Sequence, residues 1–172
     1  MPCKLVAPSM EWKDAYLDFY REWKHSGETM VPWVIEKDPK DFEEMIQYLE
    51  NHAEGLHLPE GFVPDSTYWF VNPSDNIVGA VNIRHDLTEA LRNGGGHIGY
   101  GIRPTERRKG YATELLRQSV QKACEIGIKQ VLVVCDETNL GSMKTILNNG
   151  GIIDHDFIEE DGNVVKRFWI AT

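Results

Sequence analysis

The sequence predicts a single-domain α/β protein with a mixed, mostly antiparallel sheet flanked by helices. A length of 172 residues fits one domain, and neither a linker nor a repeat divides residues 1–172. Two pairs of β-type runs are joined by short turn sequences, which is typical of antiparallel hairpins. Between the hairpins, a strand, a helix and a buried apolar strand follow one another, and this order favours a parallel βαβ unit.

Two amphipathic helices are expected at the start of the chain. Over residues 9–26, Ser9 provides an N-cap, Gly27 ends the helix, and aromatic residues recur at three- and four-residue spacing. These aromatics are Trp12, Tyr16, Phe19, Tyr20 and Trp23. A second helix is expected to begin with Asp38 as its N-cap and Pro39 at its first position.

The middle of the chain contains a hairpin, a third strand and a helix. Residues 66–71 and 76–83 have β-type composition and are joined by the turn sequence NPSD. The run HIGYGIRP, residues 97–104, predicts a third strand, which Pro104 ends because proline cannot donate a ladder hydrogen bond. Residues 111–126 place their apolar side chains on one helical face and therefore predict a helix.

The C-terminal part contains a buried strand, a short helix and a second hairpin. Residues 129–136 are nearly all apolar, as is typical of a strand covered on both faces. A short helix is expected over residues 140–149, before two glycines. Residues 152–158 and 164–170 form the second hairpin, around the turn sequence EEDGN.

Composition argues against several classes of function. A formal net charge of -9 disfavours nucleic acid as a partner. The chain lacks the long apolar run of a membrane span, and its start lacks a signal-peptide core, so we expect a cytoplasmic protein that does not bind membranes. Three widely spaced cysteines without a CxxC pair indicate reduced thiols, with no metal site.

A basic cluster lies directly before the predicted helix 111–126: Arg103, Arg107, Arg108 and Lys109. Neither Lys109, Gly110 nor Tyr111 can cap the first backbone N–H groups of that helix as Ser or Asp would. An anion bound there would accept from those amides and gain from the helix dipole. A solvated basic turn is the alternative, since the patterns GxxxxGK[ST] and GxGxxG are not matched.

Two motifs resemble the cofactor-binding segments of the GNAT acetyltransferase superfamily. Arg107-x-x-Gly110-x-Ala112, between a strand and a helix, is similar to the [QR]-x-x-G-x-[GA] pattern of the acyl-CoA pyrophosphate loop. The segment CDETNLGSMKTILNNGG is similar to the second cofactor segment, at Cys135, Asn139, Ser142 and Gly150. The element order also matches across nearly the whole chain, and LTEALRNGGGHIGYGIRP resembles a group of bacterial predicted acetyltransferases whose substrates are unassigned.

This resemblance implies a GNAT fold with a central pair of splayed parallel strands, and acetyl-CoA as the acyl donor. It implies that the backbone of Tyr100, Gly101 and Ile102 pairs with the pantetheine arm, along which Asn139 and Ser142 also lie. The pyrophosphate is expected against Arg107, Arg108, Lys109, Gly110, Tyr111, Ala112 and Thr113. A Cβ at position 110 is expected to hinder the approach of a phosphate. A homodimer through an edge strand is common in the superfamily.

The resemblance further implies direct transfer of an acetyl group to a primary amine of a small molecule or peptide. The reaction needs an oxyanion donor, a base for the ammonium and an acid for the leaving sulfur. His97 is the candidate base, with an ordinary pKa of about 6.5, although the family's usual base positions fall on Gly96 and Ile98. The family's usual acidic tyrosine is Ile146 here, so Tyr100 is the candidate acid, with a core position as its alternative.

Arg84 and His85 end the first hairpin and are expected to face the acceptor. Alternatively, His85 caps the strand end and Arg84 pairs with a carboxylate. The aromatic N-terminal helices lie where the family builds its acceptor pocket, but helical spacing of aromatics favours core packing. Because Ile146 replaces the family's usual tyrosine and His97 lies one residue away from the usual base positions, a second function stays open. This is a noncatalytic acyl-CoA-binding sensor or interaction protein.

Overall fold

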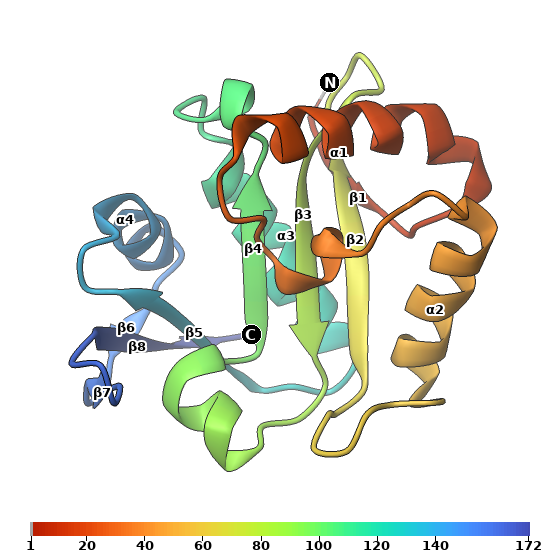
Figure 1. Ribbon diagram of the computed structural model, residues 1–172. Coiled ribbons are helices and arrows are strands. Elements are labelled where there is room, and N and C mark those ends of the chain that lie inside the picture. The colour runs from red at the N-terminus through yellow and green to blue at the C-terminus, as the bar shows by residue number, and fades with distance from the viewer. Residues whose placement is uncertain (1) are drawn as a thin grey trace.

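The computed structural model describes residues 2–172 and contains two sheets, each built of antiparallel pairs (Figure 1). The first sheet has the order β1 (Lys4–Val6), β2 (Asp65–Val71), β3 (Ile77–Arg84) and β4 (Ile98–Ile102). The second contains β5 (Gln130–Asp136), β8 (Val164–Ala171) and β6 (Ile152–Ile153), with β7 (Phe157–Ile158) also paired to β8. The α/β class and the antiparallel hairpins are confirmed, whereas β1 was not predicted.

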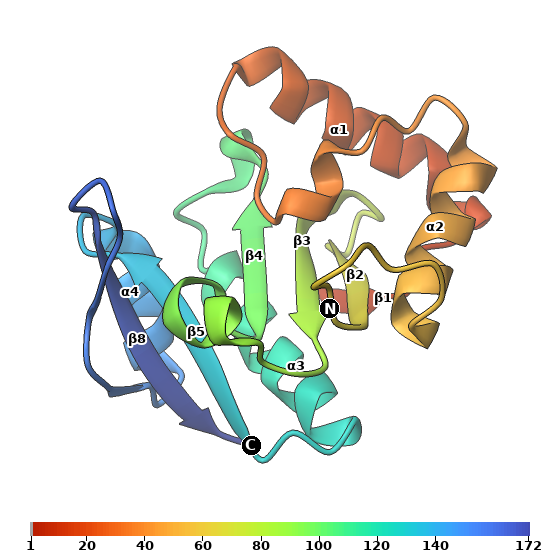
Figure 2. The same ribbon diagram turned by 60° about the horizontal axis from the view of Figure 1, so that its bottom comes forward.

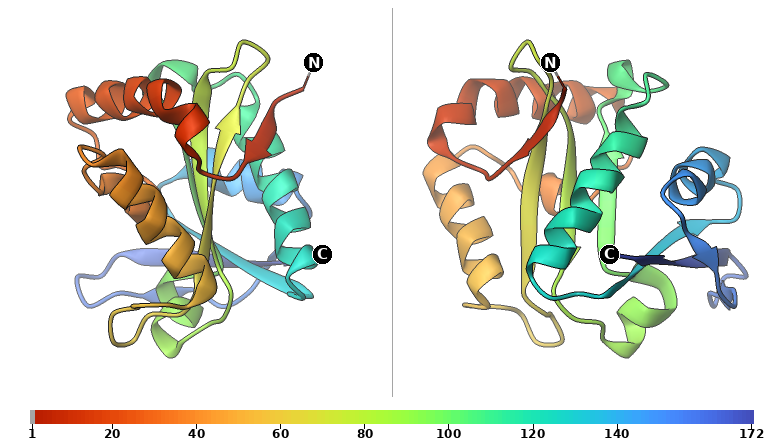
Figure 3. Two further views of the ribbon diagram at one scale, coloured as in Figure 1. Left: turned by 90° about the vertical axis from the view of Figure 1, so that its right-hand side faces the viewer. Right: turned by 180° about the vertical axis from the view of Figure 1, so that it is seen from behind.

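Four helices cover these sheets: α1 (Lys13–Ser26), α2 (Phe42–Glu54), α3 (Tyr111–Glu125) and α4 (Leu140–Asn148). Helices α1 and α2 lie on one face of the first sheet and α3 lies on the other (Figure 3). Short helical turns are found at Met10–Trp12, Trp33–Glu36, Leu91–Gly95 and Pro104–Glu106. No helix within residues 2–172 is both long enough and apolar enough to cross a bilayer.

The expected parallel pair, β4 and β5, touches at one end and does not form a ladder. The His97 N–H donates to the Leu132 carbonyl at 2.7 Å, and the Leu132 N–H donates to His97 Nδ1 at 2.9 Å. The His97 carbonyl, however, accepts from the Arg84 N–H of β3 at 2.7 Å. Because the N–H and C=O of one residue in a regular strand face the same neighbour, pairing with β5 stops at His97. The two strands diverge from this point (Figure 2).

Two hydrophobic clusters fill the space on either side of the first sheet. Adjacent residues of β2 face opposite sides: Trp69 packs with the α1 and α2 side chains, and Phe70 packs with the α3 side. The α1 aromatics Tyr16, Phe19 and Trp23 are fully buried, and the ring of Tyr16 stacks on Trp69 at 4.3 Å. The aromatic stripe of the first helix is therefore core.

The starts of the first two helices differ from those predicted. The α-helix begins at Lys13 after a separate turn, and Ser9 makes no side-chain cap. The second begins at Phe42, because Asp41 Oδ1 accepts from the Glu44 N–H at 3.0 Å and caps it. Asp38 instead accepts from Lys40 N–H at 2.9 Å and closes a local turn before the helix.

A buried arginine joins α1 to the end of β4. The Arg103 side chain, 8% exposed, donates to Glu22 Oε1 at 2.9 Å, to Asp18 Oδ2 at 2.9 Å and to the Ile77 carbonyl at 3.0 Å. Thr105 donates its N–H and its hydroxyl to the same Glu22. Burial alone would raise the pKa of Glu22, but the hydrogen bonds from Arg103 and Thr105 hold it below 4.5.

We predict that Arg103→Met lowers the free energy of unfolding at neutral pH by about 2 kcal/mol, because Glu22 loses its hydrogen-bonded charge partner. Urea unfolding measures this, with Arg117→Met as the control, whose exposed pair with Glu114 contributes at most about 0.5 kcal/mol. The folded-state pKa of Glu22 lies below its unfolded value, so its stabilisation is present above pH 4.5 and lost as the pH falls further. The unmodified protein and the Arg103→Met variant should therefore converge in free energy of unfolding at low pH.

A second stability prediction concerns the contact between β4 and β5. Gly96 has a φ of +68°, and a Cβ there would lie 2.6 Å from the Leu132 carbonyl oxygen. Gly96→Ala should therefore destabilise the fold by about 3 kcal/mol or more in urea unfolding. Gly94→Ala is the control, because its Cβ would meet only Phe157 Cδ1 at 3.9 Å, and it should shift stability little. Equal effects of the two substitutions would contradict this account.

Candidate functional site

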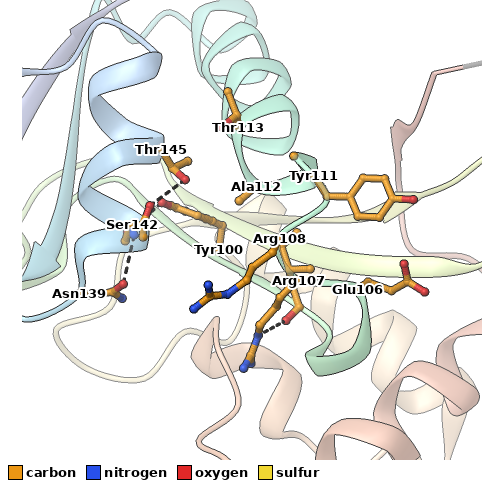
Figure 4. A pocket seen from close by; sticks show the side chains of 13 residues that line it. Tyr100, Glu106, Arg107, Arg108, Tyr111, Ala112, Thr113, Asn139, Ser142 and Thr145 are labelled. Atoms are coloured by element: carbon orange, nitrogen blue, oxygen red, sulfur yellow. Dashed lines mark hydrogen bonds between the residues drawn. The ribbon is translucent and has the colours of Figure 1, made fainter.

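An open cavity of about 370 Å³ lies where β4, the start of α3 and the start of α4 meet (Figure 4). Most of the residues predicted to contact acetyl-CoA line it: Tyr100, Ile102, Arg107, Arg108, Gly110, Tyr111, Ala112, Thr113, Asn139 and Ser142. Gly101 and Lys109 do not line it. A Cβ on Gly101 would collide with the Val31 carbonyl, so this glycine makes room for the segment after α1. The structure thus brings the two predicted motifs to one cavity.

The first turn of α3 has no side-chain cap. Gly110 occupies the N-cap position with a φ of +83°, and Arg108 also has a left-handed φ of +62°. A Cβ on Gly110 would have no neighbour within 4 Å, so the glycine is required by the backbone conformation and not by crowding within the protein. The backbone N–H groups at this helix start are left for a ligand or for solvent.

Most of the basic cluster is neutralised by the chain itself. Three members form ion pairs: Arg103 with Glu22, Arg107 with Glu28 at 2.9 Å, and Lys109 with Glu106 at 2.9 Å. Arg108 has no such partner among residues 2–172, and its side chain lines the cavity (Figure 4). Three of the four basic side chains are therefore paired within the chain, and among residues 2–172 the cluster's unpaired positive charge is that of Arg108.

Tyr100 of β4 and Ser142 of α4 meet across the gap between the sheets. The Tyr100 hydroxyl lies 2.8 Å from Ser142 Oγ, and the Ser142 N–H donates to Asn139 Oδ1 at 3.1 Å, which caps α4 (Figure 4). Burial raises the pKa of Tyr100 to about 12, although the Ser142 hydrogen bond opposes the shift. The phenol therefore stays protonated at neutral pH and can donate a hydrogen bond, although the raised pKa makes it a weaker acid than an ordinary tyrosine.

A second cavity, of about 330 Å³, opens at the same gap and shares Tyr100, Asn139 and Ser142 with the first. Its other walls come from the segment after α1, the end of β3, the turn before β4, the end of β5 and the C-terminal hairpin. These walls include Trp33, Arg84, Gly95, Asp136 and Glu159. The Tyr100–Ser142 pair thus lies where the two cavities meet.

The two histidines singled out from the sequence lie outside both cavities. His97 is 6% exposed, and its Nδ1 accepts from Leu132. Burial lowers its pKa to about 4, with the charge of Arg92 acting in the same direction. His85 Nε2 lies 2.8 Å from Ser66 Oγ, which ties it to β2. Of the expected acceptor residues, Arg84 alone lines the second cavity.

Some lining residues were missed in the sequence. Thr145 and Gly141 line the first cavity from α4. Thr145 is three residues after Ser142, so it lies on the same helical face, and this spacing could have revealed it. In the second cavity, Asp136 comes from the end of β5 and Glu159 from the turn after β7, and no local motif connects them.

Residues 9–152 match the family model of the acetyltransferase (GNAT) domain. The uncharacterized N-acetyltransferase YjdG of Bacillus subtilis is 32% identical over 118 residues. That match covers 67% of this chain and 66% of the relative, slightly under two thirds of its length.

Solved acetyltransferase structures have the same fold. The microcin C7 self-immunity acetyltransferase MccE, in complex with acetyl-CoA and AMP, gives a TM-score of 0.69 at 17% identity, over 99% of this chain and 93% of its own. The dodecameric spermidine N-acetyltransferase of Vibrio cholerae gives 0.65 at 14% identity, over 98% and 93%. Such low identities show the fold alone. Because the family model covers most of the sequence, the chain belongs to the GNAT acetyltransferase family.

Proposed function

We propose that this chain transfers an acetyl group from acetyl-CoA to a primary amine of a small molecule or peptide. The observation that carries this proposal is the pair of cavities that meet at Tyr100 and Ser142. One cavity has the features of an anion site, and the other has charged and aromatic walls suited to an acceptor. A donor and an acceptor bound in these two cavities would bring their reacting groups together beside the phenol.

The first cavity fits the donor's phosphates. Three features favour a pyrophosphate: the uncapped N–H groups at the start of α3, the left-handed turn at Arg108 and Gly110, and the Arg108 side chain, which forms no ion pair within residues 2–172. Acetyl-CoA would supply the activated acetyl thioester at the other end of this cavity. Tyr100, Asn139 and Ser142 would contact the arm that carries it.

We assign the phenol of Tyr100 as the acid in the chemical step. The neutral acceptor nitrogen forms a bond to the acetyl carbon, the carbon–sulfur bond breaks, and the nitrogen's proton passes to solvent. As that bond breaks, Tyr100 would donate its phenolic proton to the sulfur and would then be reprotonated from solvent. Ser142 holds the phenol in position. His97 is a poor candidate base, since Nδ1 is occupied and its pKa of about 4 makes the ring a weak proton acceptor.

A noncatalytic acyl-CoA-binding protein is the second candidate. Ile146, at the family's usual tyrosine position, is fully buried, and His97 is committed to the contact between the sheets. If the purified protein binds acetyl-CoA but releases no CoA with a broad panel of amines, the sensor function is favoured. Release of CoA with any amine, together with the acetylated product, supports the enzyme.

We predict that Gly110→Glu weakens acetyl-CoA binding by at least a hundredfold, because a carboxylate would face the phosphates and the left-handed backbone would be strained. Isothermal titration calorimetry measures this. Gly27→Glu is the matched control: Gly27 also has a left-handed φ, of +75°, with no atom within 4 Å of its Cβ position, and it lines neither cavity. Unchanged affinity in Gly110→Glu would remove the pyrophosphate site from α3.

We predict that Tyr100→Phe lowers kcat by at least tenfold while changing the acetyl-CoA Kd by less than about threefold, because proton donation to the sulfur is lost. CoA release and titration calorimetry provide the two measurements. Tyr20→Phe, on α1 and outside both cavities, is the control and should behave as the unmodified protein. A Tyr100→Phe variant with full kcat would show that the sulfur leaves without this acid.

A further inference from the structure

The second cavity carries charges of opposite sign on different walls. Arg84 lines it from the end of β3, whereas Asp136 and Glu159 line it from the end of β5 and the C-terminal hairpin. Its volume of about 330 Å³ lies at the lower end of the range for small-molecule sites, roughly 300–1,000 Å³. The walls therefore select by charge as well as by size.

Arg84 is half-buried and has no carboxylate partner among residues 2–172. Its Nη1 donates to the backbone carbonyls of Gly95 at 3.0 Å and Gly96 at 3.2 Å, which leaves Nε and Nη2 without a partner in that same part of the chain. Asp65 is the carboxylate that acts on Arg84 through its charge. Its two oxygens, however, are already bound to His52 at 2.8 Å and to Asn82 at 2.7 Å.

A guanidinium always carries its charge in a protein, so partial burial without a counter-ion is costly. The two backbone carbonyls hold Arg84 in place but do not neutralise it. The remaining donors, Nε and Nη2, can together bind a planar carboxylate at two points. Arg84 Nη2 lies 3.5 Å from the position that a Cβ on Gly99, another lining residue, would take, so Arg84 is suited to an anionic group of a molecule in the second cavity.

Asp136 and Glu159 form an acidic wall of the same cavity. Asp136 Oδ1 and Glu159 Oε1 both accept from Nδ2 of Asn163, at 2.8 Å and 2.6 Å. Neither carboxylate forms an ion pair within residues 2–172. Both side chains are exposed, so solvent weakens their mutual repulsion, and a cation between or beside them would reduce it further. A protonated amine entering the cavity would supply that cation.

We propose that the acceptor is a small zwitterion, an amine that carries a carboxylate in the same molecule, as amino acids do. Arg84 binds the carboxylate, while Asp136 and Glu159 attract the ammonium before it loses its proton near Tyr100. The exposed ring of Trp33 supplies an apolar wall for the carbon skeleton between the two charges. This inference rests on the proposed function and narrows it to a class of acceptor.

The test compares L-amino acids with their α-amides and with the corresponding decarboxylated amines. CoA release is measured with the full chain and saturating acetyl-CoA. We expect the kcat/KM for at least one amino acid to exceed that for its amide and its amine by about ten- to a hundredfold, as for a lost charge-assisted hydrogen bond. Arg84→Gln should reduce this ratio to near one, mainly through KM, and Arg84→Lys should keep part of it.

Arg92→Gln is the matched control, since Arg92 is an exposed arginine in the neighbouring turn Leu91–Gly95 that does not line the cavity. It should leave the ratio unchanged. Equal or faster turnover of amides and amines in the unmodified protein would overturn the zwitterion inference and leave the acetyltransferase intact.

A protein that releases no CoA with any acceptor would contradict the proposed function, and the inference is then decided by binding. For that case the melting temperature is measured with saturating CoA and each acceptor, because a ligand of the native state must raise it. A rise with an amino acid but not with its amide, lost in Arg84→Gln, supports the carboxylate site. No rise with any amino acid overturns it.

Discussion

The contact between His97 and Leu132 determines the arrangement of the rest of the molecule, because it is the backbone junction of the two sheets. At His97 the backbone turns its N–H toward β5 and its carbonyl toward β3, so the strands part immediately. The imidazole takes the place of a backbone carbonyl as acceptor for the Leu132 N–H. Its pKa of about 4 keeps that lone pair available throughout neutral pH. A residue expected to perform chemistry thus creates the gap in which the chemistry is proposed to occur.

Within residues 2–172, the divergence leaves one edge of β4 without a strand partner over the length that borders both cavities. An exposed edge presents alternating N–H and C=O groups, which is the pattern that an extended ligand with amide bonds can pair with. The two cavities meet at Tyr100 and Ser142, in the gap that this divergence opens. Under the proposed function, the splay therefore sets both the path of the donor arm and the direction from which an acceptor approaches.

Local patterns in the sequence predicted most elements, because hairpin turns, helical periodicity and the buried β5 run depend on near neighbours. The gathering of Arg108, Gly110 and the uncapped α3 start at one cavity was predicted for the same reason, since these features are adjacent in the chain. The pairing of Arg103 and Arg107 was not predictable, because their partners are 81 and 79 residues away on α1 and the loop after it. The role of His97 was hidden likewise, because Leu132 is 35 residues distant.

The position of the family's usual tyrosine holds Ile146 in this chain, and the structure shows that this side chain packs in the core. Ile146 is fully buried in the core cluster that holds α4 against the sheets, so a phenol there would have to be satisfied or exposed. Tyr100 instead brings a phenol from β4, on the opposite side of the gap, to Ser142 on α4. Because an acid must lie within reach of the sulfur, its position in the chain is less constrained than its position in space. The apolar residue packs α4 against the core, and under the proposed function the strand supplies the acid.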